Sequence, residues 1–428
     1  AHPGSMSGGM TEIYQEGLRI PVVKLYRAGE LQSDLFEMML LNVRVREERR
    51  GDYNAQMAAL RYGERRLKRL AETYGVAMLD AVFDQIITRT GARMAAALAE
   101  VPDGTYRFED VMDDDGRDMV GVPIAVTVTI AGSQAVFDFT GTSPQTPGNI
   151  NIPLHGTKAA VCYVVKALLD PEIPNNQGVL DAIEVTAPAG TLLNCVSPAA
   201  VASRAHTSQR IIDVVLGALA PALPERVIGA ANGANTMAVF SGRHPDTGEE
   251  YVYLETLGGG MGGRNDRDGK DGVQVHITNT SNLPVEAIEM EFPLRVESYG
   301  LIPDSGGAGQ FRGGMGLRRV VTPVGHDCLF NGVGERFRTQ PWGVFGGAAG
   351  AGGQFRFADG AGAARVLPPK TGNQVLTAAE KVIIDTPGAG GYGPPSARAP
   401  EARDADRRSG KFSDAYMAQH YSESTGDD

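Results

Sequence analysis

The hydrophobic pattern divides the chain into a helical first part and a strand-rich remainder. Between about residues 30 and 100, apolar side chains recur at the spacing of one helix face. This pattern predicts three helices: one opens at Ser33 with Glu37 as a first-turn cap, one is capped by Asp52 and ends at Gly75, and one covers 77–101. The charged runs in this part fit solvated helix faces.

After residue 104 the period changes to that of strands, with two helices between them. A buried helix is expected at 158–169, and a second begins at Thr207 or Ser208, either of which can cap it, and ends at Leu219. Alternating apolar and polar residues predict the strands. They are expected at 106–108, 124–130, 135–139, 183–186, 226–230, 236–240, 250–256, 273–278, 317–323, 354–358 and 381–385.

Glycine is the outlier in composition, with 55 residues. They cluster at 258–263, 306–316, 346–353 and 388–393. Glycine accepts positive φ angles and lets backbones approach closely, so these clusters predict tight turns around a ligand or between strands. The fold class is therefore predicted to be α+β: a mixed fold with an N-terminal helical region followed by glycine-rich β segments with interspersed helices.

The same patterns suggest how the chain is organised. A length of 428 residues allows two or three domains. We expect an N-terminal loop and helical region at 1–103, a mixed α/β core at 104–303 and a glycine-rich β region at 304–394. Residues 395–428 are polar and poor in apolar side chains, which predicts a disordered tail.

Charge and cysteine content exclude several classes of protein. The formal net charge is -11 and no basic stripe offsets it, which argues against a nucleic-acid partner. No apolar run approaches the roughly 18 residues that span a bilayer, so no membrane partner is expected. The three cysteines, Cys162, Cys195 and Cys328, show no CxxC spacing. They are expected to be buried free thiols in a reduced, cytoplasmic compartment.

Two nucleotide-binding motifs and one hydrolase motif can be rejected. Gly258–Gly263 matches GxGxxG, but a dinucleotide site needs an apolar helix after that turn, and here a charged bend follows. The chain contains neither a Gly-Lys-Ser/Thr phosphate loop nor a GxSxG elbow. If the reaction uses ATP, another polypeptide must bind it.

Polar side chains that can do chemistry gather between residues 253 and 307. His276 lies there with Glu255 and Glu289, and a histidine with two carboxylates could bind a metal ion or transfer protons. His155 and His206 also stand beside predicted helix ends, although single histidines of this kind are more often structural. The stretch is predicted to form part of an active site built on loops between strands.

Seven motifs in one order along residues 1 to about 394 resemble the hydantoinase B/oxoprolinase family. They are Thr11-Glu-Ile-Tyr-Gln-Glu-Gly-Leu-Arg-Ile-Pro21, Thr207-Ser-Gln-Arg-Ile-Ile-Asp213, Tyr253-Leu-Glu-Thr-Leu-Gly-Gly-Gly260, His276-Ile-Thr-Asn-Thr280, Pro293-Leu-Arg-Val-Glu297, Pro303-Asp-Ser-Gly-Gly-Ala-Gly-Gln-Phe-Arg-Gly-Gly-Met-Gly316 and Thr386-Pro-Gly-Ala-Gly-Gly-Tyr-Gly393. Because the motifs are long and keep their order, the resemblance is specific.

The resemblance implies one subunit of a hetero-oligomeric, ATP-dependent enzyme with a small-molecule substrate. A partner of the hydantoinase A type would bind ATP and convert the carbonyl oxygen to a phosphate, which makes an unreactive amide open to attack. The first expectation is ring-opening of a cyclic amide such as a hydantoin, 5-oxoproline or a lactam. The alternatives are a subunit of an acetone- or acetophenone-type ketone carboxylase and a non-catalytic structural subunit.

Site roles follow from the clustered polar motifs as hypotheses. Glu255 or His276 would be the base or a metal ligand, Asn279 and Gln209 would orient the substrate carbonyl, and Arg295 would hold an anionic group. The predicted catalytic residues are His276, Glu255, Asn279 and Glu289, and the predicted substrate-binding residues are Gln209, Arg295, Glu12 and Glu16.

A divalent metal is a further implication of the resemblance. Family members carry a segment before the equivalent of Ala1 that contains His and Asp residues associated with a metal site. The metal ligands are therefore expected partly outside this chain, which is expected to be a fragment and inactive without that segment and its partner.

Overall fold

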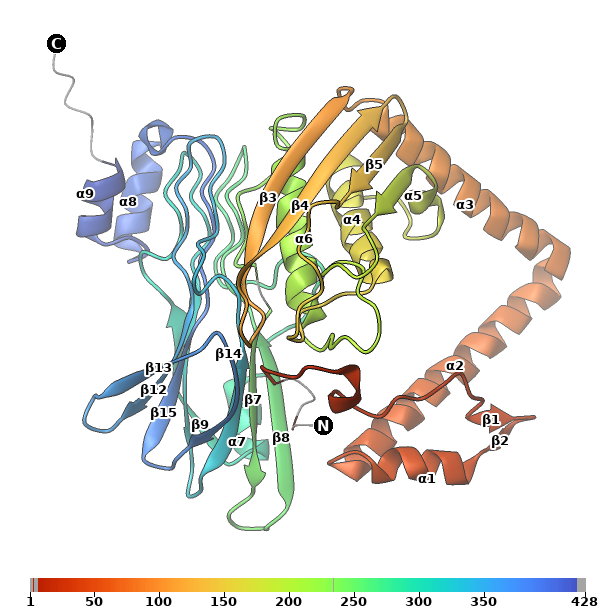
Figure 1. Cartoon of the computed structure of the whole chain (residues 1–428), viewed down its shortest axis with the longest axis horizontal. Coiled ribbons are helices and arrows are strands. Elements are labelled where there is room, and N and C mark those ends of the chain that lie inside the picture. Colours follow the sequence, from red (N-terminus) through yellow and green to blue (C-terminus); the bar gives the residue numbers. More distant parts are fainter. Residues whose placement is uncertain (1–2, 4–6, 234, 422–428) are drawn as a thin grey trace.

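The computed structural model describes residues 3, 7–233 and 235–421, and it has the predicted α+β fold. Most of the opening loop expected at residues 1–6, and the end of the expected tail at 422–428, lie outside the described residues. Figure 1 shows a helical arm, a mixed lobe and a lobe built of two sheets. A 3-10 turn, η2 (Ile13–Gln15), and a small hairpin of β1 (Tyr26–Arg27) and β2 (Glu30–Leu31) precede the arm.

The helical arm confirms the three predicted helices. It consists of α1 (Ser33–Leu41), α2 (Arg46–Tyr74) and α3 (Val76–Leu98), and α2 and α3 form a wide V that extends away from the body (Figure 1). No residue of α2 is buried, whereas the far end of α3 buries Met94 and Leu98 against the mixed lobe.

The predicted caps of these helices are wrong. The residue at the N-cap of α1 is Gln32, and Glu37 instead forms ion pairs with Arg46 and Arg50. Asp52 lies inside α2, where it pairs with Arg49 at 2.8 Å. In both cases the carboxylate forms an ion pair with an arginine side chain. The predicted cap would instead have accepted hydrogen bonds from backbone N–H groups.

The mixed lobe contains one four-stranded sheet and three helices. Its strands are β3 (Gly104–Asp114), β4 (Val120–Ala131), β5 (Gln134–Asp138) and β6 (Ile183–Thr186) in that order, with β5 and β6 parallel and the other pairs antiparallel. Alternate residues of β4, from Ile124 to Ile130, point into the core.

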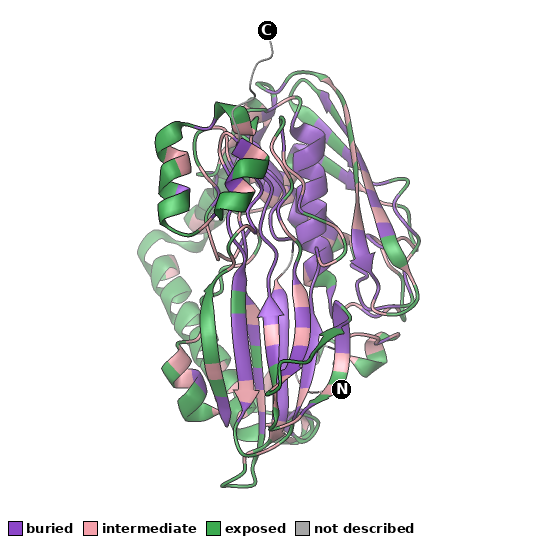
Figure 2. Ribbon diagram, turned by 90° about the vertical axis from the view of Figure 1, so that its left-hand side faces the viewer, coloured by how far each residue is buried: buried purple, intermediate pink, exposed green. Residues whose placement is uncertain are grey.

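The helices of the mixed lobe are α4 (Leu154–Leu169), α5 (Gly178–Asp181) and α6 (Arg204–Leu219). α6 packs on β3 and β4, and α4 packs on α6. From His206 onward every residue of α6 is buried, and Figure 2 shows it as a buried rod in the middle of the molecule. Thr207 and Ser208 lie inside this helix and Ser203 is at its N-cap, so the cap prediction here is wrong.

The second lobe is a sandwich of two antiparallel sheets. One contains β7 (Thr236–Arg243), β8 (Glu250–Leu257), β11 (Cys328–Val333) and β14 (Lys370–Leu376), in the order β14-β11-β7-β8. The other contains β9 (Leu294–Leu301), β10 (Leu317–Pro323), β12 (Gln354–Asp359), β13 (Ala364–Leu367) and β15 (Glu380–Asp385), in the order β13-β12-β15-β10-β9. The short helix α7 (Val285–Glu291) precedes β9.

Aromatic side chains fill the space between these sheets. The ring of Phe330 lies 5.7 Å from that of Phe355 and 5.8 Å from that of Phe357 in the facing sheet. β7 pairs with β8 on one side and with β11 on the other, and β11 pairs with β14. One sheet therefore joins strands from the regions expected to be separate, 104–303 and 304–394. The strands expected at 226–230 and 273–278 are loops, apart from a single bridge between Val273 and Gly259.

The glycine clusters lie against one another as stacked backbone. A Cβ at Gly313 would lie 1.9 Å from the carbonyl oxygen of Ala389, and one at Gly390 would lie 1.9 Å from that of Trp342. Within the four clusters only Gly346 and Gly393 have φ in the left-handed region. Close approach of backbones, rather than turn geometry, therefore explains most of these glycines.

The segment 395–421 is ordered, so the prediction of disorder there is wrong. It forms η3 (Pro395–Ala397), α8 (Pro400–Arg408) and α9 (Asp414–Tyr421). Asp406 is buried between Arg398 and Arg312, whose nearest nitrogens lie 2.6 Å and 3.1 Å from its carboxylate. Phe412, Met417 and Tyr421 of the same segment are buried against Ala308 and Met315, so ion pairs and a small apolar cluster together hold it.

Two further expectations concern the cysteines and the membrane. All three cysteines are free; Cys328 is buried, whereas Cys162 and Cys195 are only partly buried. Within the described ranges, no helix combines the length and the apolar character needed to cross a membrane.

Two glycine-to-alanine substitutions should have opposite effects on stability. A Cβ at Gly217 of α6 would lie 2.6 Å from the ring of Phe108, whereas one at Gly63 of α2 would meet no atom within 4 Å. We expect Gly217→Ala to lower the free energy of unfolding by about 1–3 kcal/mol through overpacking. Gly63→Ala should raise it by about 0.5–1 kcal/mol through helix propensity. Urea denaturation of both variants measures this, and equal effects would contradict the packing of α6 on β3.

Candidate functional site

His276 is held where the two lobes meet. It lies in the loop after β8 with a φ of 63°, a left-handed conformation that costs a non-glycine residue about 1 kcal/mol or more. Its side chain is only 4% exposed. Its Nε2 lies 3.6 Å from Oδ1 of Asp213 on α6, and its Nδ1 lies 3.4 Å from the hydroxyl of Tyr163 on α4. The packing of two helices therefore assembles this cluster.

Asp213 is a charged group in the protein interior. Burial opposes its ionisation, but His276 and Arg336 together hold the pKa of Asp213 below its usual value. It is therefore a carboxylate at neutral pH. A buried carboxylate beside an imidazole can fix the orientation of the ring and the nitrogen that carries the proton.

A buried ion-pair network lies behind Asp213. Nη2 of Arg336 lies 2.7 Å from Oδ2 of Asp110 and 2.8 Å from Oδ2 of Asp213. Arg210 lies 3.3 Å from Asp110 and 3.2 Å from Glu335. Lys370 of β14 pairs with Glu335 and with Asp114, and Asp114 also pairs with Arg338, so the network joins four carboxylates to four cations. The network connects β3 and α6 of the mixed lobe with the sandwich.

The open side of His276 faces a pocket of about 430 Å³, here named the His276 pocket. Tyr163, Arg264 and Gln274 line it with His276. Burial raises the pKa of Tyr163, against the effect of the Arg264 charge, so its hydroxyl stays protonated at neutral pH. The pocket thus offers an imidazole, a hydroxyl donor and a guanidinium, which can transfer a proton and stabilise a negative charge.

Gln209 is the predicted site residue that lies beside His276. Its Nε2 donates hydrogen bonds to the carbonyl oxygen of Val275 at 2.9 Å and to Oδ1 of Asn235 at 3.2 Å. Gln209 is therefore engaged with the loop that carries His276, and it positions that loop against α6.

The glutamates expected beside His276 lie elsewhere. Glu255 of β8 is buried in an ion pair with Arg319 of β10, between the two sheets of the sandwich. Glu289 is exposed on α7 and accepts a hydrogen bond from the backbone of Val296 at 2.9 Å. The carboxylate that does lie beside His276 is Asp213.

The four remaining predicted residues lie near the surface, and none lines the His276 pocket. Asn279 and Arg295 are exposed, on the loop after His276 and on β9. Glu12 is exposed and its backbone bridges to Ala199. Glu16 accepts hydrogen bonds from two backbone nitrogens of the loop before α6, each at 2.7 Å, and burial raises its pKa.

The sequence contained a signal for Asp213 but none for Tyr163. Asp213 ends the motif that begins at Thr207, and it follows Gln209 by four residues, which places both on one helix face. Tyr163 stands in an apolar helix where an aromatic residue is expected for packing alone. Its part in the site follows only from the position of α4 against the loop of His276.

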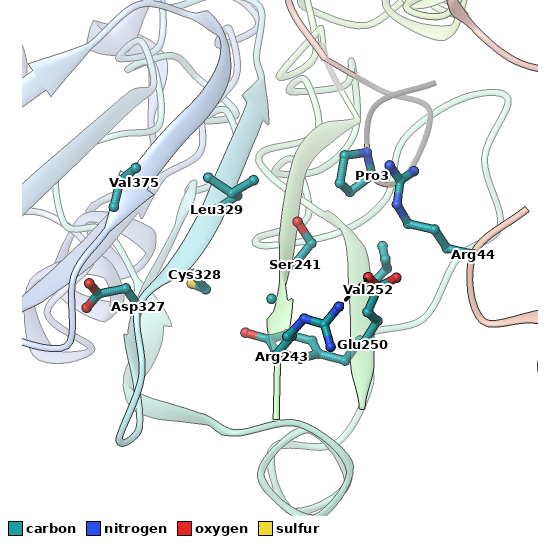
Figure 3. Close-up of a pocket in the computed structure, with 12 residues that line it drawn as sticks. Pro3, Arg44, Ser241, Arg243, Glu250, Val252, Asp327, Cys328, Leu329 and Val375 are labelled. Atoms are coloured by element: carbon teal, nitrogen blue, oxygen red, sulfur yellow. Dashed lines mark hydrogen bonds and ion pairs between the residues drawn. The ribbon is translucent and has the colours of Figure 1, made fainter. Parts of the chain in front are cut away.

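A different pocket opens at the edge of the sheet that contains β7, β8 and β11 (Figure 3). It has a volume of about 380 Å³. Arg243 and Glu250 in its wall pair with each other at 3.3 Å (Figure 3). Burial raises the pKa of Cys328 to about 12, so its thiol is a poor nucleophile at neutral pH. This pocket therefore offers less chemistry than the His276 pocket.

The described residues do not form a complete metal site. Nowhere in the described ranges do three His, Cys, Asp or Glu side chains come together so that they could hold a metal ion. His276 and Asp213 supply two such groups, and two ligands are fewer than protein metal sites use. Metal ligation stays a prediction, and no step proposed below runs through a metal.

Comparison with known proteins shows which family the chain belongs to. The model of the family described as hydantoinase B/oxoprolinase matches residues 1–395. The chain belongs to the hydantoinase B/oxoprolinase family. It is 33% identical to the B component of a putative D-/L-hydantoinase from a Pseudomonas species, and the match covers 91% of this chain and 67% of that protein.

Two solved structures share the fold of this hydantoinase B/oxoprolinase family member. The crystal structure of the ATP-dependent caprolactamase from Pseudomonas jessenii is 29% identical, with a TM-score of 0.90 over 98% of this chain and 74% of that one. Nucleotide-free acetone carboxylase is 18% identical, with a TM-score of 0.87 over 98% of this chain and 62% of that one. The first likeness supports the family, and the second shows the fold alone.

Stability should fall as the pH drops from 6.5 to 4, because of His206. This residue is fully buried in α6, and burial, followed by the charge of Lys370, lowers its pKa from 6.5 to about 4. The unfolded chain binds a proton in this window that the folded protein does not, so about 3 kcal/mol is lost as the pH falls. Urea denaturation between pH 7 and 4 measures the loss. His206→Asn should remove this part of the pH dependence, and an unchanged slope would contradict the assignment.

Proposed function

We propose that this chain is the subunit of an ATP-dependent hydantoinase- or 5-oxoprolinase-type hydrolase that opens a cyclic amide. A partner ATPase of the hydantoinase A type binds ATP and phosphorylates the carbonyl oxygen. The observation that carries the proposal is the cluster of His276, Asp213 and Tyr163 at one pocket of a chain that belongs to this family. The activities named for its relatives, a hydantoinase component and a caprolactamase, support a cyclic amide as substrate.

His276 is the base of the proposed reaction. The carboxylate of Asp213 lies beside Nε2 and favours a proton on that nitrogen, which leaves the lone pair of Nδ1 toward Tyr163 and the pocket. Nδ1 takes a proton from the water that attacks the phosphorylated carbonyl carbon, and both protons of that water pass to the ring nitrogen as the C–N bond breaks and a carboxyl phosphate forms. A second water then hydrolyses the carboxyl phosphate to the carboxylate and inorganic phosphate. General base catalysis of this kind contributes about 10²–10⁴-fold to a rate.

Tyr163 and Arg264 act on the same intermediate. The neutral hydroxyl of Tyr163 donates to the attacking water or to a substrate oxygen, and Arg264 stabilises the negative charge that develops there. Gln209 holds the backbone of Val275 and thereby keeps His276 in place. The site thus has one proton acceptor, His276, and two groups that stabilise negative charge, Tyr163 and Arg264, as acyl transfer requires.

The other predicted residues take more distant roles in this proposal. The ion pair with Arg319 makes Glu255 a link between the sheets, so the role of base goes to His276. Asn279, Glu289 and Arg295 are exposed and are proposed to contact substrate or partner in the assembled enzyme.

The proposed assembly extends beyond this chain. We place ATP on the partner, divalent-metal ligands partly outside this chain, and the hetero-oligomeric complex in the cytoplasm. An acetone-type ketone carboxylase subunit is the second candidate, because acetone carboxylase shares the fold at a TM-score of 0.87. Turnover of ATP that depends on bicarbonate and a ketone would favour this candidate.

Replacing His276 should abolish hydrolysis without unfolding the protein. In the complex with the partner ATPase and the full-length subunit, we expect His276→Ala to lower kcat for 5-oxoproline or hydantoin by about 10²–10⁴-fold. Tyr163→Phe keeps the ring and removes only the hydroxyl, so a smaller loss is expected. Thermal unfolding of each variant is the structural control. Turnover like that of the wild type in His276→Ala would exclude His276 as the base.

Replacing Glu255 should lower stability rather than the chemical rate. Glu255→Gln keeps the size of the side chain but leaves the buried Arg319 charge without its carboxylate, which costs about 3 kcal/mol or more. We expect a lower unfolding temperature and a near-normal kcat at a temperature where the variant is folded. A loss of kcat above about 10²-fold in folded protein would instead return Glu255 to the catalytic residues.

A further inference from the structure

A second pocket, here named the α4 pocket, lies along helix α4 and has a volume of about 710 Å³. One wall is a face of α4, and the other is the segment between α4 and α5. Its lining residues are His155, Lys158, Ala159, Cys162, Tyr163, Lys166, Ala167, Pro171, Asn175, Asn176, Gln177, Leu180 and Ile277. Apolar side chains are thus combined with a few polar ones, as in sites that bind small organic molecules.

The charged groups of this pocket are all basic. Lys158 follows His155 by three residues, and Lys166 follows Lys158 by eight. This spacing places all three on one face of α4. No carboxylate occurs among the lining residues. The two lysines alone give the pocket a charge of about +2 at neutral pH.

These lysines are not held by partners in the protein. Within the described ranges, neither Lys158 nor Lys166 forms an ion pair through its ammonium group, although both side chains are partly buried. The carboxylate of Asp170, at the end of α4, pairs with Arg93 rather than with a lysine. Its Oδ2 lies 3.0 Å from Nε of Arg93. An ammonium group without a counterion in the protein can form charge-assisted hydrogen bonds with an anion from solution.

The α4 pocket adjoins the His276 pocket. Tyr163 and Ala167 line both, so the ring of Tyr163 forms part of a shared wall. His276 lines one pocket and the next residue, Ile277, lines the other. An anionic group at the lysines would therefore lie in the pocket next to the one that holds His276, with the ring of Tyr163 between them.

We propose that the α4 pocket binds the carboxylate or phosphate group of the substrate through Lys158 and Lys166, so that the substrate is an organic anion. This inference rests on the proposed function, because it takes His276 as the reacting end of the site. Among cyclic amides it favours those that carry an acidic group, such as 5-oxoproline, over neutral rings. The lysines position the substrate and take no part in proton transfer.

Thiol labelling can test the site without any substitution in the pocket. Cys162 lies between the two lysines on the same face, whereas Cys195 lies outside the pocket and is also partly buried. Burial raises the pKa of both thiols, so Cys195 is a matched internal control. The rate of reaction with N-ethylmaleimide at each cysteine is measured by mass spectrometry on the full chain.

The added molecules are 5-oxoproline, inorganic phosphate and 2-pyrrolidinone, which has the same ring as 5-oxoproline without the carboxylate. We expect 5-oxoproline or phosphate to slow labelling of Cys162 and not of Cys195, with protection that weakens as salt is added. We expect no protection by 2-pyrrolidinone. Protection by 5-oxoproline identifies a carboxylate as the anion, and protection by phosphate alone identifies a phosphorylated substrate.

Substitutions then assign the effect to the lysines. Lys158→Ala and Lys166→Ala should each weaken the protecting anion about tenfold, because each removes one charge-assisted hydrogen bond. Lys381→Ala, which removes an exposed lysine on β15, should change nothing. Labelling of Cys162 in the absence of anion shows that each variant keeps the pocket folded.

The outcomes separate this inference from the proposed function. Absence of protection by both anions, or equal protection in the Lys158→Ala/Lys166→Ala double variant, overturns the anion site. If the anions protect Cys162 but His276→Ala keeps full turnover, the anion site stands and the assignment of His276 as base fails.

Discussion

The contact on which the site depends is the pair of ion pairs from Arg336 to Asp110 and Asp213. Arg336 comes from the sandwich, Asp110 from β3 and Asp213 from α6. All three side chains are buried, so their charges cannot be solvated by water and must satisfy one another. The network therefore fixes α6 relative to the sandwich, and Asp213, once fixed, determines where His276 is held.

The glycine clusters support the loop that carries His276. At Gly313 and Gly390, segments distant in sequence come so close that a Cβ would collide with a neighbouring carbonyl. This stack lies between the sandwich and the mixed lobe and is continuous with the loop that leads from β8 to His276 (Figure 1). Dense backbone packing gives that loop a rigid support, and the support allows a histidine to keep a left-handed conformation.

Local pattern and local chemistry account for most of the secondary structure that the sequence predicted. Helical spacing identified α1, α2 and α3, and alternation identified β4 and β8. Of these, α1, α3, β4 and β8 bury one face at their own period, whereas α2 keeps the helical spacing without burying a residue. The prediction failed where side chains form contacts that the local pattern does not show, through ion pairs or through burial against a distant segment. Asp52 joined an ion pair inside α2, and α8 folded around the buried Asp406 although its composition predicted disorder.

The sequence by itself determined the fold class and the family, because periodicity and motif order are properties of neighbouring residues, and it proposed His276 as a site residue. It could not determine which carboxylate lies beside His276. Glu255 and Glu289 are closer in the chain, yet Asp213 and Tyr163 reach the imidazole from α6 and α4. Which side chains converge is decided by the packing of helices against sheets, and the buried charges of Arg336, Asp110 and Asp213 allow only the arrangement in which each has a partner.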